Sequence, residues 1–289
     1  MKRSDNYDSL KSTNRVTHGI FVFLKWFFLI FLFAFAVLPF VWLVLISFKS
    51  HGEFLKYPLR LPETWRFSNY VTAFQMAKMH ILIPNSIIIA CSATILNVLV
   101  TSMGAFVVTR EKIRFSRTLT NIILLGVLIP IISFMVPYLS MIRSLHLYNT
   151  RFALILTYAA INLPISFFIL HAFMLDIPVA LEEAAIIEGA TVFQRFTKVI
   201  LPLSTSGIVT AGTLCFIYAW NEFAYAMLLT SSTAVRTVQL GISFFSTQFR
   251  SDYPAMYAAI VISIIPSIVM YAFLHNRIIS GFTAGAVKG

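Results

Sequence analysis

Six long apolar runs dominate the sequence, and they constrain the fold more than any other feature. They are Trp26–Phe48, Leu82–Val108, Leu119–Ile142, Phe152–Leu175, Leu203–Leu229 and Pro254–Asn276. A helix of about 20 apolar residues crosses a hydrocarbon core of about 30 Å. Lipid offers no hydrogen-bond partner to a free backbone group, so runs that cross it must be helical. The sequence therefore predicts an all-α membrane protein with six transmembrane helices.

The composition agrees with this class and excludes an ordinary soluble domain. Of the 289 residues, 58% are hydrophobic and 11% are charged, whereas a soluble domain carries about 25% charged residues. The first apolar run is too long for the core of a cleavable signal peptide, and no small-residue cleavage site follows it. We expect it to remain as the first span.

The net charge of +11 does not predict a nucleic-acid partner. The basic residues are scattered over the tails and loops, with no basic stripe that alternates with aromatic residues. Cys91 and Cys215 both lie inside apolar runs, so no disulfide framework is predicted.

The distribution of Lys and Arg predicts the orientation. An even number of spans puts both termini on one side, and that side holds 13 of the 22 Lys and Arg residues, including the short basic loop Arg110–Arg117. Basic loops stay in the cytoplasm. We therefore expect a cytoplasmic N-terminal tail over residues 1–18, a membrane domain over 19–280 and a cytoplasmic C-terminal tail over 281–289.

Residues 177–200, called here the charged insert, interrupt the apolar sequence between the fourth and fifth spans. Asp176 followed by Pro178 is typical of a helix start. Gly189 predicts a stop, because Gly enters positive φ freely. Thr191 and Gln194 match a capping box that starts a second short helix.

Pro202 then ends that second helix and opens the fifth span. The sequence thus predicts a helix–Gly–helix element outside the membrane, on the cytoplasmic side. On the residues alone two interpretations remain open. The element could be an amphipathic interfacial helix pair, or the small residues Ala184 and Ala185 beside Gly189 could admit the backbone of a partner protein.

The stretch "EAAIIEGATVFQRFTKVILP" resembles the EAA motif of ABC importer permeases. It reads Glu-Ala-Ala, three residues, Gly, nine residues, an aliphatic residue, one residue, then Leu-Pro. The matching positions, which the resemblance implies to be ATPase-coupling residues, are Glu183, Ala184, Ala185, Gly189, Val199, Leu201 and Pro202. Glu188 departs from the Asp that often precedes the Gly, although an acid is kept.

Further segments are similar to maltose-type (MalG-like) carbohydrate permeases, namely "WNEF" (Trp220–Phe223) and the ending "GFTAGAVKG" (Gly281–Gly289). The resemblance implies the type I ABC importer permease fold, a bacterial inner or plasma membrane location, and import of a carbohydrate, here an oligosaccharide. It implies four further kinds of component: a second permease subunit that completes a heterodimer, two ATPase subunits, an extracytoplasmic sugar-binding protein and the lipid bilayer. It also implies that ATP and Mg are bound by the ATPase and that this chain binds no cofactor.

Glu222 is the only acidic residue well inside an apolar run. An ionisable group inside a membrane is a functional candidate by default, but a structural role is the alternative, with Glu222 wetted near the outer helix end or hydrogen-bonded to a loop, and it is the one we expect. Together with Trp220, Asn221, Asn162 and Tyr138 it forms the set of candidate residues for the substrate path or its gate. The loop Thr230–Tyr253 corresponds by order of spans to the family's loop that reaches the binding protein.

Two other classes of function compete with the permease interpretation. An ion-coupled secondary transporter would use Glu222 as its coupling acid, but it should show paired broken helices and several intramembrane charges. An intramembrane enzyme would need a catalytic cluster within the spans. The sequence contains no Gly-Lys pair, so the chain has no P-loop of its own.

Overall fold

The computed structural model describes residues 4–111, 113–248 and 252–286, and every regular element in these ranges is helical. The helices group into two compact units, residues 1–70 with 251–261, and residues 71–250 with 262–289. The all-α prediction is confirmed.

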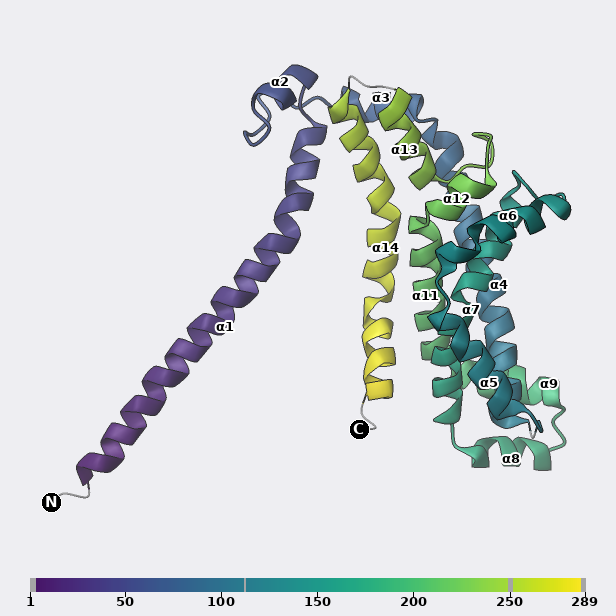
Figure 1. The fold of residues 1–289 in the computed structure, drawn as a ribbon. Coiled ribbons are helices and arrows are strands. Elements are labelled where there is room, and N and C mark those ends of the chain that lie inside the picture. The colour runs from purple at the N-terminus through teal and green to yellow at the C-terminus, as the bar shows by residue number, and fades with distance from the viewer. Residues whose placement is uncertain (1–3, 112, 249–251, 287–289) are drawn as a thin grey trace. The chain divides into compact units, whose positions relative to one another are not determined.

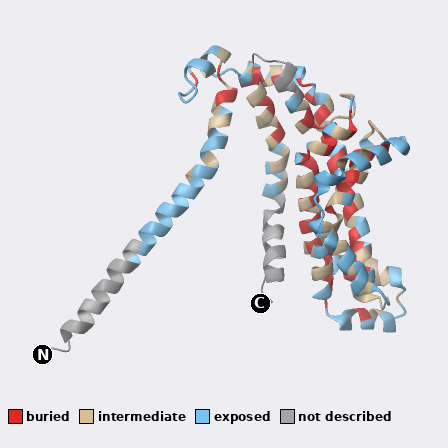
Figure 2. Ribbon diagram, viewed as in Figure 1, coloured by how far each residue is buried: buried red, intermediate tan, exposed pale blue. Residues whose placement is uncertain are grey.

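The first unit is built on α1 (Ser4–Ser47), a helix of 44 residues. Residues 4–18, predicted as a polar tail, continue this helix without a break. From Phe21 to Phe40 the side chains are mostly exposed (Figure 2). An apolar helix that is exposed on all sides suits a hydrocarbon environment.

A short helix, α2 (His51–Lys56), follows α1 and is capped by Ser50, whose hydroxyl accepts a hydrogen bond from Glu53 N at 3.2 Å. Lys49 is fully buried beside it. Its ammonium donates to the carbonyls of Tyr57 at 2.7 Å and Pro58 at 3.1 Å. These bonds stabilise the C-terminal end of α2, where carbonyls lack helical partners.

The core of the second unit is formed by three helices that run side by side (Figure 1): α4 (Met79–Arg110), α7 (Arg151–Leu175) and α11 (Thr205–Asn221). Their facing surfaces are rich in small side chains, which lets membrane helices approach closely. Asn97 on α4 links two of them, because its side-chain amide donates to the carbonyl of Ala159 at 2.8 Å.

The remaining helices are shorter, apart from the last. They are α3 (Ser68–Met76), α5 (Ser116–Leu125), α6 (Met135–Ser144), α8 (Val179–Ile187), α9 (Val192–Gln194), α10 (Leu201–Leu203), α12 (Ala224–Leu229), α13 (Val238–Gln248) and α14 (Tyr253–Ala286). The predicted C-terminal tail is therefore helical as far as Ala286, and its residues 287–289 lie outside the described residues.

Three helices are long and apolar enough to cross a membrane, at Phe21–Ser47, Met79–Arg110 and Tyr253–Ala272. Three bent pairs also qualify. They are Ser116–Leu128 with Ile131–Ser144 at 93°, Arg151–Ile161 with Leu163–Leu175 at 48°, and Val192–Leu203 with Thr205–Asn221 at 77°. The prediction of six spans holds when each bent pair is counted as one span.

The third and fifth apolar runs are helical but broken within the run. In the third run Pro130 has no N–H and disfavours a helical residue before it, so Ile129 is extended with φ −79° and ψ 122°. In the fifth run α11 ends at Asn221, and Glu222 is extended with φ −69° and ψ 132° before α12 begins. Pro164 lies inside α7 next to its bend.

The packing of α11 on α7 generates a first prediction. A Cβ at Gly207 would lie 2.7 Å from Phe173 Cγ, whereas a Cβ at Gly212 on the same helix would meet Thr94 and Val98 at an ordinary 3.5 Å. Overpacking of a tight contact costs about 1–3 kcal/mol. We expect Gly207→Ala to lower the melting temperature of the detergent-solubilised protein by several degrees.

Gly212→Ala is the matched control and should leave the melting temperature nearly unchanged. Equal melting temperatures for the two variants would contradict the close approach of α11 to α7.

Candidate functional site

The charged insert has the predicted helix–Gly–helix geometry. Helix α8 ends at Ile187, Glu188 is its C-cap, and Gly189 follows with φ +80°. Its N–H donates to the carbonyl of Ile186 at 2.9 Å, and the N–H of Ala190 donates to the carbonyl of Ala185 at 2.9 Å. These two bonds form a Schellman motif, which requires a left-handed residue at the glycine position.

The second half of the insert begins with the predicted capping box. Gln194 N donates to Thr191 Oγ1 at 3.3 Å, and Thr191 N donates to Gln194 Oε1 at 2.8 Å. The helix continues from α9 as the π-helical turn η3 (Arg195–Ile200) and then as α10. Pro202 cannot donate to the turn before it, and a π-helical widening accommodates such a missing bond.

Two details of the predicted boundaries are wrong. Asp176 is the C-cap residue of α7, and Pro178 rather than Asp176 occupies the N-cap position of α8. Pro202 does not end the second helix but lies within α10, and the bend follows at Ser204.

The predicted coupling residues divide between the surface and the interior. Glu183, Ala184, Gly189 and Pro202 are exposed, while Ala185, Val199 and Leu201 are half-buried. Two large apolar side chains of the insert are also exposed, Ile187 at 86% and Phe193 at 72%. An apolar surface of this kind suits contact with another protein or with a membrane.

Four charged residues, two from the insert and two from the end of α4, meet where the insert packs on the helix bundle, and no sequence pattern predicted this cluster. We call Arg110, Glu111, Glu182 and Arg195 the Arg–Glu cluster. Arg195 donates to Glu182 Oε1 at 2.5 Å and to Glu111 Oε1 at 2.8 Å. Arg110 Nε lies 3.9 Å from Glu182 Oε2. Glu111 and Arg195 are 84 positions apart, so no local pattern could have joined them.

Glu222 lies at the break between α11 and α12 and is 9% exposed. Its carboxylate accepts three hydrogen bonds, from Tyr158 Oη at 2.8 Å, Tyr225 N at 2.8 Å and Ala226 N at 3.1 Å. The two backbone donors are the free N–H groups of the first turn of α12, where negative charge is favourable. The geometry therefore explains why an acidic residue is buried here, because its carboxylate accepts hydrogen bonds from the backbone at the helix break.

The other predicted path residues lie in different environments. Trp220 is fully buried and donates to the carbonyl of Ser263 at 3.0 Å, and Asn162 donates to the carbonyl of Tyr158 one turn earlier at 2.8 Å. These bonds favour packing roles for both. Asn221 is exposed and donates to the carbonyl of Ile217 at 2.9 Å.

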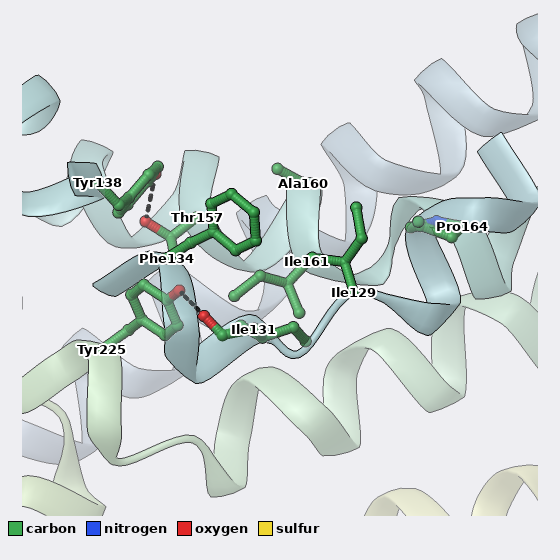
Figure 3. Close-up of a pocket in the computed structure, with 10 residues that line it drawn as sticks. Ile129, Ile131, Phe134, Tyr138, Thr157, Ala160, Ile161, Pro164 and Tyr225 are labelled. Carbon is green, nitrogen blue, oxygen red and sulfur yellow. Dashed lines mark hydrogen bonds between the residues drawn. The ribbon is translucent and has the colours of Figure 1, made fainter. Parts of the chain in front are cut away.

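Tyr138 lines a pocket of about 320 Å³ between the broken third span, α7 and α12 (Figure 3). The lining residues are Gly126, Ile129, Ile131, Phe134, Tyr138, Thr157, Ala160, Ile161, Pro164 and Tyr225. Tyr138 Oη lies 2.8 Å from Thr157 Oγ1. Since Thr157 already donates its one hydroxyl proton to Ala153 O, Tyr138 is the donor of this bond.

Tyr225 holds the opposite wall of the pocket. Its hydroxyl donates to the carbonyl of Ile131 at 2.9 Å, directly after the break at Pro130 (Figure 3). Its ring meets the ring of Tyr138 edge to face, with centroids 5.6 Å apart. A helix break inside a membrane needs such side-chain partners for its freed backbone groups.

The segment that joins α12 to α13 is held by polar side chains of distant elements. Asn149, with φ +61°, accepts hydrogen bonds from Ser231 N at 2.9 Å and Ser232 N at 3.0 Å. Asn85 donates to the carbonyl of Ala234 at 2.8 Å, and Ser86 accepts from Val238 N at 2.8 Å. The start of the predicted loop Thr230–Tyr253 is thus ordered, while its residues 249–251 lie outside the described residues.

The geometry at Glu222 generates a second prediction. In Glu222→Gln the single amide oxygen can replace only one carboxylate oxygen, so one N–H at the start of α12 loses its acceptor whichever way the amide turns. An unsatisfied buried donor costs about 1–3 kcal/mol. We expect a clear fall in melting temperature, larger than that of Tyr158→Phe, which removes one donor and leaves both backbone bonds intact.

The measurement is a thermal unfolding series on the two variants. If Glu222→Gln melts at the wild-type temperature both in detergent and in lipid, this structural role is contradicted and the role of a coupling acid is favoured.

Comparison with known proteins identifies the family. Residues 98–280 match the family described as binding-protein-dependent transport system inner membrane component. The putative ABC transporter permease protein ORF2 of Caldicellulosiruptor sp. is 37% identical over 269 residues, which cover 92% of this chain and 97% of that protein. The trehalose/maltose transport system permease protein MalG of Thermococcus litoralis is 36% identical over 255 residues, covering 87% and 91% of the two chains.

The fold is also that of a solved transporter. A chain of a bacterial ABC transporter involved in the import of the acidic polysaccharide alginate matches with a TM-score of 0.73 and 24% identity, over 96% of this chain and 98% of that one. This likeness supports the type I importer permease fold. The chain therefore belongs to the inner-membrane components of binding-protein-dependent transport systems, the permeases of ABC importers.

Proposed function

We propose that this permease imports a carbohydrate, in the form of an oligosaccharide, and forms half of the translocation pathway. A relative that is 36% identical along most of its length is named for trehalose and maltose transport. The observation that carries the coupling part of the proposal is the exposed, doubly capped insert at Gly189. As a permease the chain is not itself the ATPase, so ATP and Mg are bound by a partner.

The remaining components follow from this role. A second permease completes a heterodimer, two ATPase subunits supply energy, and an extracytoplasmic sugar-binding protein delivers the substrate. In the proposed orientation the insert and both termini face the cytoplasm, as the basic loop Arg110–Arg117 favours. The ordered start of the loop Thr230–Tyr253 then lies on the opposite side, where the binding protein docks.

The ATPase docks on the exposed surface of the insert. Glu183 supplies charge there, and Ile187 and Phe193 supply apolar area. Gly189 fixes the angle between α8 and α9 through its positive φ. Closure of an ATPase dimer around ATP would then move the two halves of the permease as rigid bodies between inward and outward access.

The pathway runs along the broken third span. Non-helical backbone at membrane depth is tolerated only where protein buries it or where it lines a water-filled cavity. Ile129 has such a backbone and lines the pocket. Phe134 and Tyr138 present aromatic surface in the same pocket, and we assign them to contact with the apolar face of a sugar ring.

The ion-coupled alternative is not favoured. It requires Glu222 to exchange protons with the path, yet both of its carboxylate oxygens are engaged by backbone donors of α12. Trp220 and Asn162, which were also candidates for the path, make internal hydrogen bonds. Of the predicted path residues, Tyr138 keeps the strongest support.

The insert generates a third prediction. Gly189→Val forces a β-branched residue into a left-handed conformation, which costs about 1–2 kcal/mol or more, so α9 should tilt and the ATPase should be lost from the tagged permease. Gly189→Asn is the matched control, because Asn tolerates this conformation. It should retain the ATPase and most of the uptake. The readouts are uptake of radiolabelled trehalose and maltose, and ATPase retained on purification.

Glu183→Lys tests the docking surface separately from the turn. It should reverse charge at an exposed position and reduce uptake, while the permease still inserts and still melts at the wild-type temperature. Full uptake with both Gly189→Val and Glu183→Lys would refute coupling and leave the insert as an interfacial helix pair. Uptake by this chain without any ATPase would refute the importer itself.

A further inference from the structure

The Arg–Glu cluster lies where the charged insert meets the helix bundle. Arg110 is the last residue of α4, Glu111 is its C-cap, Glu182 belongs to α8 and Arg195 begins η3. Arg110 also donates to the carbonyl of Met174 in the last turn of α7 and to that of Ile177 at 2.7 Å. One connected set of charged groups therefore joins α4, α7 and both halves of the insert.

The cluster is largely withdrawn from water and is electrically balanced. The side chains of Arg110 and Glu182 are each 5% exposed, that of Arg195 is 12% exposed and that of Glu111 is 31% exposed. Two cations face two anions. Removal of one member of such a buried set leaves an uncompensated charge, whereas apolar replacement of a whole set is often neutral. Stability alone therefore does not explain why charged groups occupy this joint.

What the charged groups supply is a defined geometry. The planar guanidinium of Arg195 bonds Glu182 with one terminal nitrogen and Glu111 with the other. A fork of this kind fixes distance and direction at the same time, which a lysine ammonium cannot do. The contact on the Arg110 side is looser, at 3.9 Å, and Arg110 Nε makes no hydrogen bond among the described residues. Arg195 is thus the residue that sets the position of α8 relative to the end of α4.

We propose that the Arg–Glu cluster is the rigid joint through which displacement of the insert is transmitted to α4 and α7, with Arg195 as its positioning residue. This inference rests on the proposed docking of an ATPase. The docking residues lie on the exposed surface of the insert, and the cluster lies on its inner face. Without the fork, the insert still binds the ATPase and moves with it, but this movement no longer displaces α4 and α7.

The test uses the complete complex of this chain, the second permease and the ATPase, reconstituted in lipid nanodiscs. Arg195→Lys keeps the charge and removes the fork. Arg117→Lys is the matched control, since Arg117 is exposed in the neighbouring basic loop and makes no ion pair among the described residues. The readouts are ATPase retained, melting temperature, and hydrolysis of MgATP with and without the purified binding protein.

We expect Arg195→Lys to retain the ATPase, while the stimulation of MgATP hydrolysis by the binding protein falls by about fivefold or more, the lower end of typical coupling between sites. Arg117→Lys should keep the wild-type stimulation. The double variant Glu111→Gln/Arg195→Gln removes one charge of each sign and leaves the Arg110–Glu182 pair. The double variant should show the same loss of stimulation by the binding protein. It replaces Arg195→Lys as the test if that variant does not assemble.

Three results would overturn the inference in distinguishable ways. Wild-type stimulation in assembled Arg195→Lys and in the double variant would show that the fork transmits nothing. Failure of both variants to assemble would show that the cluster only maintains the fold. A wild-type complex that retains no ATPase would instead refute the proposed function, and the joint with it.

Discussion

The structure depends on one constraint, that lipid cannot hydrogen-bond to a free backbone group. Where the chain stays helical the constraint is met within each helix. Where a helix breaks, side chains from elsewhere must supply the bonds. Glu222 does so for the start of α12, and Tyr225 does so for Ile131 after the break at Pro130. These two breaks are therefore not defects of packing, because a specific side chain holds each of them. The pocket with Tyr138 forms beside one of these supported breaks.

The charged insert obeys different rules because water can reach it. Its helix ends are satisfied locally, by the Schellman motif at Gly189 and the capping box at Thr191. Large apolar side chains such as Ile187 and Phe193 remain exposed on the insert. Its inner face is fixed by Arg195 to the end of α4. A rigid element with one free face and one anchored face is what a mechanical connection between two proteins requires.

The sequence predicted the features that short-range patterns encode. The six apolar runs, the turn at Gly189 and the capping box each depend on residues within one span or one turn. It did not predict the break at Glu222 or the bonds that explain it, because Tyr158 is 64 positions away. The Arg–Glu cluster was missed for the same reason. The boundary between α7 and α8 was misplaced because the connection is short, and its Asp176 is the C-cap of α7. Pairing across the bundle is set by packing, which a single sequence does not display.

The central claim is that the insert contacts an ATPase on the cytoplasmic side. It is tested most directly by a photo-crosslinking amino acid placed at Ile187, which is 86% exposed, in cells that express the whole transporter. The matched position is Leu59, which is 83% exposed in the segment after α2 and lies on the proposed extracytoplasmic side. The account predicts a covalent adduct with the ATPase from Ile187 and none from Leu59. An ATPase adduct from Leu59, or none from Ile187 in a transporter that still imports sugar, would contradict it.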